Sequence, residues 1–221
     1  MKIPLTPEGL LSVRRLTKEG IPINFTLGFS ARQNYVAARL ANPDFVNVFL
    51  GRLNQVVVDN ELGSGDMVGE KVTLATQRAL RELRGLNPQV RSRLIAASIR
   101  NGEQVASLAG VDVLTIPPKA MLDYVDSNKT PESIRDNTQT DPEPGVDFDQ
   151  MWGAKCNALW DIPDSFRSSI DQLIASPGLD TMSGEELEGF LETHGVSLFH
   201  RFSQHDLDTI VDHGKIPKVG A

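Results

Sequence analysis

KIPLTPEGLLSVRRLTKEGIPINFTLG, residues 2–28, has the pattern of a strand, a helix and a second strand in close succession. Thr6 is a favourable N-cap and Pro7 suits the first helical turn, whereas Gly20 suits the position just after the helix ends. Residues 21–28 are then predicted to form a buried strand. This order of elements indicates an α/β fold with a parallel sheet. The helix has an apolar stripe at helical spacing, formed by Leu10, Val13 and Leu16.

The same alternation of strands and helices continues beyond this unit. Further strands are predicted at residues 45–50, 94–99 and 111–116. Further helices are predicted at residues 30–41, 66–84 and 102–109, with another opening at residues 119–125. A longer connection with the Gly-rich stretch 63–65 is expected after the third strand. Five parallel strands form either an open sheet or five-eighths of a barrel, and length and periodicity do not decide between the two.

The pattern changes after residue 126, where the strand-like segments end. Residues 1–126 are predicted to be a β/α domain, residues 127–147 a polar surface loop or linker, and residues 148–221 a helical extension. Ser183 and Glu186 have the spacing of a capping box at the start of one extension helix. The extension helices are predicted at residues 148–158, 162–175, 183–193 and 203–212.

The composition argues against several classes of protein. The net charge of −7 disfavours a general nucleic-acid binder, which needs a basic face. It does not argue against a protein that binds a small phosphorylated ligand. No apolar run approaches the roughly 18 residues of a membrane span, and the N-terminus lacks a signal pattern, so a cytoplasmic protein is expected. Cys156 is the only cysteine and is expected to be an inert thiol. No metal site is expected, because the histidines are widely spread: His194, His200, His205 and His213.

Polar residues gather where the predicted strands end, and α/β folds bind ligands at the carboxyl ends of parallel strands. Lys2 lies in an apolar strand, where partial loss of hydration favours the neutral amine that attacks carbonyl groups; the alternative is a solvated lysine at a frayed end. Arg52 and Arg100 follow two different strands. They are suited to grip one phosphate, or each is a solvated loop charge. The other candidates at strand ends are Asn24, Thr26, Asn47, Phe49 and Ser98.

Four blocks of the sequence, in the expected order and with nearly the expected spacing, resemble blocks of the transaldolase family. The first consists of KIP at 2–4, TPEG at 6–9 and LTKEGI at 16–21, and the second is NFTLGFSARQ at 24–33. The third is VFLGR at 48–52, and the fourth is IAASIR at 95–100, followed by AGVD at 109–112 and LTI at 114–116.

The resemblance implies a (β/α)8 TIM barrel of the transaldolase type. The Schiff-base lysine of that family is on the fourth strand and corresponds to Lys2, so this chain would hold about strands 4–8 and a C-terminal helical extension. The first three strands of the family carry an Asp, a neighbouring Asn and a Glu, which would be missing here. The Asp and the Glu are the acid–base partners of the family's mechanism.

The resemblance also implies a role for each candidate residue. Lys2 would form the Schiff base, and Thr26 would help to hold the water that shuttles protons. Asn47 stands where the family commonly has Ser, and its amide can still hydrogen-bond a substrate hydroxyl. The arginines and Ser98 would grip the phosphate. The substrate-binding set would be Asn24, Asn47, Phe49, Arg52, Ser98 and Arg100.

The implied activity is the transfer of a dihydroxyacetone unit between sugar phosphates, as in the pentose phosphate pathway, without a metal or cofactor. The implied ligands are fructose 6-phosphate, sedoheptulose 7-phosphate, erythrose 4-phosphate and glyceraldehyde 3-phosphate. A second copy of the chain or a complementing N-terminal half would be the polypeptide partner. Two alternatives stay open: an enzyme like fructose-6-phosphate aldolase, and an inactive sugar-phosphate-binding fragment. Phe49 favours transaldolase, since the related aldolases usually have tyrosine there.

Overall fold

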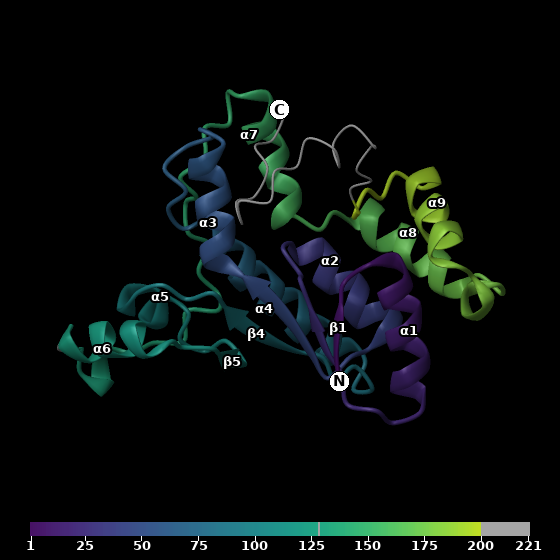
Figure 1. The fold of residues 1–221 in the computed structure, drawn as a ribbon, viewed down its shortest axis with the longest axis horizontal. Helices are drawn as coiled ribbons and strands as arrows, with labels where there is room; N and C mark the ends of the chain where they lie inside the picture. The colour runs from purple at the N-terminus through teal and green to yellow at the C-terminus, as the bar shows by residue number, and fades with distance from the viewer. Residues whose placement is uncertain (128, 200–221) are drawn as a thin grey trace.

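The computed structural model describes residues 1–127 and 129–199. Its centre is a parallel sheet whose five strands follow one another in chain order (Figure 1). The expected α/β fold with five parallel strands is confirmed, and the arrangement is consistent with part of a TIM barrel. The strands are β1 (Lys2–Pro4), β2 (Asn24–Thr26), β3 (Phe45–Phe49), β4 (Arg93–Ala97) and β5 (Val113–Leu114).

Helices connect successive strands, and side-chain caps start the first two of them. The Thr6 hydroxyl accepts a hydrogen bond from the backbone N–H of Gly9 at 3.0 Å, and Ser30 accepts one from Gln33 at 3.1 Å. The second helix continues into a π-helical turn that ends at Asn42 in the left-handed conformation. The helical elements before residue 127 are α1 (Pro7–Lys18), α2 (Ala31–Val36), η1 (Ala37–Ala41), α3 (Leu50–Asp59), α4 (Val68–Leu86), α5 (Gly102–Ser107) and α6 (Pro118–Asp126).

Helix α3 differs from the prediction of a long connection after residue 50. The helix begins at Leu50, directly after β3 ends at Phe49, so no turn residue separates the two elements. Leu50, Leu53 and Val57 are buried at helical spacing, and α3 packs against α4. The helical period is therefore present in the sequence, but the uninterrupted apolar run from β3 conceals where the strand stops. The connection itself is only residues 60–67.

Two strands, β2 and β5, are shorter than predicted by several residues. The strand predicted at residues 21–28 covers only Asn24–Thr26, because the backbone turns at Leu27, which has a φ of 68°. The strand predicted at residues 111–116 is reduced to Val113–Leu114, the part that pairs with β4.

The two faces of the sheet differ in burial. One face has no exposed surface along its middle strands and carries apolar side chains at every second position. Helix α1 packs on this face, since a Cβ on Gly9 would lie 3.3 Å from the ring of Phe25. The apolar core therefore lies between this face and the helices. Its strand residues are Phe25, Val46, Val48, Leu94 and Ala96.

The polar segment predicted as a loop or linker lies against helix α4 in its described part, residues 129–147. It contains one 3-10 turn in these residues, η2 (Pro131–Ser133). The Lys71 ammonium of α4 contacts the Asp141 carboxylate at 2.8 Å, and Arg78 donates to the backbone oxygen of Thr140 at 2.6 Å. Polar groups of this segment are thus bonded to α4.

The end of the same segment crosses the Gly-rich connection before α4. The Gly65 N–H donates to the backbone oxygen of Gly145 at 2.9 Å, and the Gly145 N–H donates to that of Asp66 at 2.7 Å. A Cβ on Gly63 would lie 2.3 Å from the Gly145 oxygen, and a Cβ on Gly145 would lie 2.1 Å from the Ser64 hydroxyl. Two backbones therefore approach here more closely than side chains allow.

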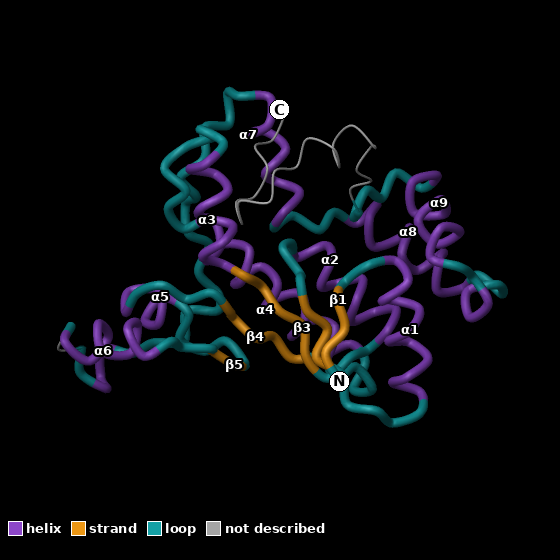
Figure 2. The backbone as a smooth tube through the Cα atoms, viewed as in Figure 1, coloured by secondary structure: helices purple, strands orange, loops and turns teal. Residues whose placement is uncertain are grey.

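The C-terminal extension contains α7 (Met151–Lys155), η3 (Cys156–Leu159), α8 (Asp164–Ala175), η4 (Leu179–Thr181) and α9 (Gly184–Thr193). Helices α8 and α9 of the extension pack against η1 and α1 at the right of Figure 2, whereas η3 contacts α2. The predicted capping box of the extension is confirmed, with reciprocal bonds between Ser183 and Glu186. The helix predicted at 203–212, and His200, His205 and His213, lie outside the described residues. No helix in the described ranges is long and apolar enough to cross a membrane.

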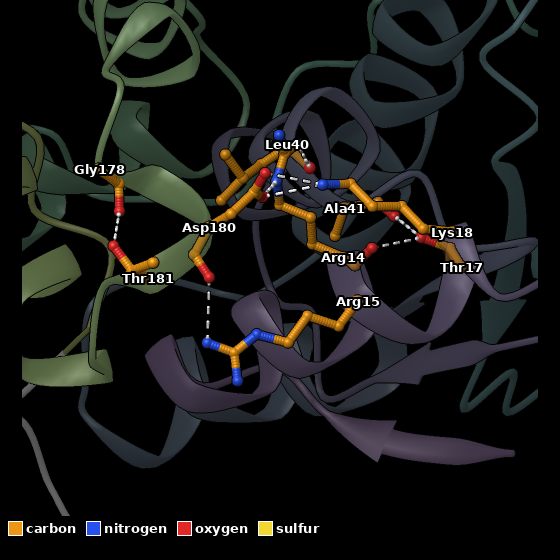
Figure 3. Close-up of polar contacts among 9 residues, drawn as sticks. All are labelled: Arg14, Arg15, Thr17, Lys18, Leu40, Ala41, Gly178, Asp180 and Thr181. Atoms are coloured by element: carbon orange, nitrogen blue, oxygen red, sulfur yellow. Dashed lines mark hydrogen bonds and ion pairs between the residues drawn. The ribbon is translucent and has the colours of Figure 1, made fainter.

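Asp180 of η4 fastens the extension to α1 (Figure 3). Its carboxylate accepts hydrogen bonds from Arg14 at 2.7 Å and from Lys18 at 2.9 Å, and its backbone oxygen accepts one from Arg15 at 3.3 Å. Arg14 also donates to the backbone oxygen of Leu40 at 2.7 Å, which joins η1 to the same cluster. The hydrogen bonds from Lys18 and Arg14 lower the pKa of Asp180 to about 2.

Candidate active site

Five of the residues predicted from the sequence lie on one face of the sheet, here called the site face. In the parallel register Lys2 is opposite Asn24, and Asn24 is opposite Phe45. Side chains alternate between the two faces of a strand, so residues paired in register point to the same face. The site face is therefore the one opposite to the buried face of Phe25. It carries Lys2, Asn24, Thr26, Asn47 and Phe49.

Two polar atoms of the site face are buried without a hydrogen-bond partner among the described residues. They are Oδ1 of Asn24 and Oγ1 of Thr26, and Thr26 is only 8% exposed. Buried polar atoms usually have a partner, and an unsatisfied one costs about 1–3 kcal/mol. The two oxygens are therefore suited to bind a polar ligand or a water molecule at the middle of the sheet.

The backbone on both sides of Lys2 is hydrogen-bonded to β2. The Asn24 N–H donates to the Met1 oxygen and the Leu5 N–H donates to the Thr26 oxygen, both at 2.8 Å. Lys2 is therefore not at a frayed end. Its side chain, however, is exposed and forms no ion pair with a described residue. Residues 1–127 and 129–199 therefore do not shield the Lys2 amine from water in the way that the sequence predicts.

Arg52 and Arg100 line the same pocket, which has a volume of about 600 Å³. Arg52 lies in the first turn of α3, and Arg100 lies just after the end of β4. Both side chains are exposed, and neither pairs with a carboxylate in the described part of the chain. Asp59 and Asp66 also line the pocket and oppose an anion there. Two unpaired guanidinium groups are nevertheless well suited to grip a phosphate.

A close backbone contact brings the ends of β3 and β4 together. A Cβ on Gly51 would lie 2.2 Å from the backbone oxygen of Ser98 and 2.7 Å from Nε of Arg100. Ser98 is half-buried and has a φ of 66°, in the left-handed region that residues other than glycine rarely adopt. This turn after β4 carries Arg100 to the start of α3, where Arg52 lies.

The predicted residues thus form two groups. Arg52 and Arg100 line the pocket, whereas Lys2 and Thr26 lie on the site face and do not line it. Phe49 is the last residue of β3 and directly precedes α3, so it stands between the two groups. Its ring lies 5.8 Å from the ring of Phe29.

Three polar helix residues beside the arginines are not apparent from the sequence pattern. Asn54 and Gln104 line the pocket, and Glu70 lies behind them with only 3% of its surface exposed. In sequence, a buried carboxylate or amide in a helix looks the same as a solvated one. The burial depends on where α3, α4 and α5 meet, which local periodicity does not specify.

A parallel β/α sheet with a lysine on one strand, and with paired arginines after two others, is the arrangement of the β/α class, in which ligand sites lie at the carboxyl ends of the strands. The sequence model of the Transaldolase/Fructose-6-phosphate aldolase family matches residues 1–176. The chain therefore belongs to this family of sugar-phosphate enzymes.

Individual relatives match over a shorter range. The chain is 37% identical over 123 residues to a probable transaldolase of Parvibaculum lavamentivorans, which covers 55% of this chain and 50% of the relative. It is 33% identical over 138 residues to a probable transaldolase of Hyphomonas neptunium, covering 61% and 56%. With a probable transaldolase of Thermus thermophilus it shares 38% identity over 119 residues, covering 53% and 47%. The chain spans about half the length of the curated relatives it matches.

Proposed function

We propose that this chain forms about strands 4–8 of a transaldolase barrel and takes part in the transaldolase reaction. In this proposal residues 1–126 are the partial barrel, residues 127–147 a polar loop or linker, and residues 148–221 a helical C-terminal extension. The observation that carries the proposal is the shared pocket of Arg52 and Arg100, whose guanidinium groups have no carboxylate partner in the described ranges. Paired arginines at strand ends are suited to a sugar phosphate.

The proposed chemistry begins with attack of the Lys2 amine on the carbonyl carbon, C2, of a ketose phosphate. Loss of water gives an iminium ion. The C3–C4 bond then breaks, and its electrons move into the iminium to give an enamine. At the same time the C4 hydroxyl gives its proton to a water molecule held by the Thr26 hydroxyl, and the aldose phosphate leaves.

The second half of the proposed reaction runs the same steps towards a new acceptor. The enamine attacks the aldehyde carbon of a second aldose phosphate, whose oxygen takes up the proton from water. Hydrolysis of the new iminium then frees Lys2 and the product ketose. The phosphate held by Arg52 and Arg100 orients the reacting carbons, since binding energy from a distant group can position the reacting one. Fructose 6-phosphate and sedoheptulose 7-phosphate would be donors, and erythrose 4-phosphate and glyceraldehyde 3-phosphate acceptors.

The test is intact-mass analysis after borohydride reduction in the presence of fructose 6-phosphate. The expected result is a mass gain of one reduced dihydroxyacetone unit in the wild-type chain and in Lys119→Ala, but not in Lys2→Ala. Lys119 is a matched control because it is an exposed lysine on α6, away from both groups of site residues.

Two results would count against the proposal. An adduct of equal amount in Lys2→Ala would show that the Schiff base, if any, forms elsewhere. Absence of an adduct in the wild-type chain would remove the catalytic role of Lys2. Free dihydroxyacetone is used in parallel, since nonspecific modification of exposed lysines would occur with it equally well.

An aldolase that releases free dihydroxyacetone is the second candidate, because the family model covers both activities. The residue that bears on this choice is Phe49, which lies between the two groups of site residues and lacks the hydroxyl of the tyrosine usual in the related aldolases. Product analysis with and without an acceptor aldose separates the two activities: a transaldolase needs the acceptor to release its dihydroxyacetone unit.

A sugar-phosphate binder without catalysis is the third candidate. It is favoured by one observation, the exposed Lys2 side chain, which contacts no carboxylate among the described residues. Binding of fructose 6-phosphate that depends on Arg52 but leaves no adduct after borohydride reduction would support this candidate over the two enzymes.

A further inference from the structure

The pocket lined by Arg52 and Arg100 is called the arginine pocket here. Behind it, helix α4 carries a buried carboxylate that pairs with no cation in the described residues. Glu70 is 3% exposed. Its Oε1 accepts a hydrogen bond from the Gln104 side-chain amide at 2.9 Å, and its Oε2 accepts one from the Asn54 amide at 3.0 Å. A buried carboxylate is costly unless it is paired or well hydrogen-bonded, and here the two amide donors supply the hydrogen bonds.

The other ends of the two amides bind backbone N–H groups. Oε1 of Gln104 accepts from the N–H of Arg100 at 2.7 Å, and Oδ1 of Asn54 accepts from the N–H of Gly69 at 2.6 Å. An ionised carboxylate only accepts hydrogen bonds, so it forces both amides to present their NH2 groups to it. Their oxygens must then point away, towards the two backbone donors. Glu70 thus fixes the orientation of both amides.

This network joins the segments that hold the arginines. Asn54 lies two residues after Arg52 on α3, Gln104 lies on α5, and the latter binds the backbone of Arg100 itself. Through Glu70 the two segments are tied to the same residue of α4. Glu70 therefore links α3, close to Arg52, with the backbone of Arg100.

We propose that Glu70 is a positioning residue that sets the spacing of Arg52 and Arg100 for a phosphate, through Asn54 and Gln104. This inference rests on the proposed function, in which the arginines grip the phosphate of the substrate. Glu70 does not touch the ligand in this proposal. It acts by donor and acceptor matching. The two NH2 groups bind different oxygens of Glu70, and an amide at position 70 would place an NH2 group of its own at one of these two positions.

The experiment combines Glu70→Gln with a compensating exchange. In Glu70→Gln, one NH2 group faces another, and a buried donor is left unsatisfied. The double variant Glu70→Gln/Gln104→Glu reverses the pair. Gln at position 70 then donates to Glu at position 104 and still accepts from Asn54, while Glu at position 104 also accepts from the Arg100 N–H. The set of hydrogen bonds and the net charge are both restored.

Two quantities are measured by NMR on the whole chain: the affinity for inorganic phosphate and the hydrogen-exchange rate of the Arg100 amide. Glu70→Gln is expected to weaken phosphate binding and to speed exchange at Arg100, each about tenfold, by the loss of a buried hydrogen bond. The double variant is expected to return the Arg100 exchange rate towards the wild-type value, whereas phosphate affinity stays low because the new carboxylate at position 104 lines the pocket and opposes an anion. A merely structural role for Glu70 does not predict recovery in the double variant at Arg100.

Gln104→Met serves as a second variant if Glu70→Gln does not fold. It removes the bond to the Arg100 N–H and leaves Glu70 in place, and it is expected to change both quantities in the same direction. Wild-type exchange at Arg100 in a folded Glu70→Gln, or in Gln104→Met, would overturn the inference. If the wild-type chain binds no phosphate, the proposed function fails, and Arg100 exchange alone then decides whether Glu70 holds this backbone.

Discussion

Gly51 is the residue where one added methyl group would most directly change the arginine pocket. Its neighbours are backbone and guanidinium atoms from the end of β4, and a Cβ there would lie 2.2 Å from the Ser98 oxygen. Backbone atoms cannot rotate away as a flexible side chain can. The contact between α3 and the β4 end must therefore open if residue 51 has a side chain.

We predict that Gly51→Ala lowers the free energy of unfolding by about 1–3 kcal/mol, the usual cost of overpacking. Gly85→Ala in α4 is the matched control, since no atom lies within 4 Å of its Cβ position. Replacing a helical glycine in open space is expected to stabilise by about 0.5–1 kcal/mol. Urea denaturation measures both changes. An equally stable Gly51→Ala would mean that the β4 end can move freely.

Single substitutions at Arg52 and Arg100 test whether the pocket is specific for a phosphate group. Arg52→Ala and Arg100→Ala are each predicted to weaken binding of fructose 6-phosphate about tenfold or more, because a charge-assisted hydrogen bond contributes about 1.5–3 kcal/mol. Binding of unphosphorylated fructose should not change. Isothermal titration with both sugars checks this, with Arg15→Ala, which lies at the extension contact, as the control. Equal losses for both sugars would contradict a phosphate site.

At the scale of elements, the docking of the C-terminal extension involves both ion pairs and apolar contacts. The ion pairs between the extension and α1, α2, η1 and α4 are partly exposed, and such pairs contribute only about 0–1 kcal/mol each. Full burial of one leucine contributes about 1.5–3 kcal/mol. The apolar residues of α8 and α9 therefore dominate. The ion pairs are Arg14–Asp180, Lys18–Asp180, Arg32–Asp161, Arg39–Asp171 and Arg167–Glu82.

We predict from this comparison that Leu173→Ala, in α8, destabilises the chain by about 2–5 kcal/mol, since Leu173 has no exposed surface. Asp171→Ala, on the same helix, should cost less than about 1 kcal/mol although it removes the ion pair with Arg39. Thermal denaturation of the two variants gives the ranking. The reverse ranking would show that charge, and not burial, holds the extension.

Asp180 gives the extension a defined response to acid. Its pKa is about 2 in the folded chain against an ordinary value of 3.8, because Lys18 and Arg14 donate to it. The folded state therefore binds fewer protons than the unfolded state between these values. The stability that Asp180 contributes is present above about pH 4 and is lost as the pH falls through about 2.

The matching prediction concerns the difference in melting temperature between the wild-type chain and Asp180→Asn. The wild-type chain should be the more stable one above pH 4, and the difference should shrink to zero towards pH 2. Asp149→Asn is the control, because Asp149 is exposed and its carboxylate forms no bond in the described part of the chain. A difference that does not depend on pH would argue against this account of Asp180.

At the scale of the whole molecule, the sequence predicts the order of strands and helices well, because each βα unit carries its own local signals. Thr6, Ser30 and Ser183 are caps whose hydroxyls bond as expected. Helix α3 is missed because the strand before it ends without a turn residue, at Phe49. Where an apolar run serves two elements, composition alone does not locate the boundary.

The site is predicted in part, for a physical reason. Arg52 and Arg100 are found from their places after strands, and the structure brings them to one pocket. The roles assigned to Lys2 and Thr26 stay predictions. Glu70 cannot be identified from local sequence patterns, because its burial results from the meeting of three helices around it. Long-range packing decides which polar residues are buried, and that information is spread over the chain.

The crossing of the backbones at Gly63 and Gly145 limits which residues can replace these glycines during evolution. A Cβ on Gly63 would meet the backbone oxygen of Gly145, and a Cβ on Gly145 would meet the Ser64 hydroxyl, so neither position can gain a side chain while the two segments stay in contact. Among descendants that retain the crossing, both glycines should persist together. Where one has been replaced, the other should be free to vary, and insertions should appear between residues 127 and 147.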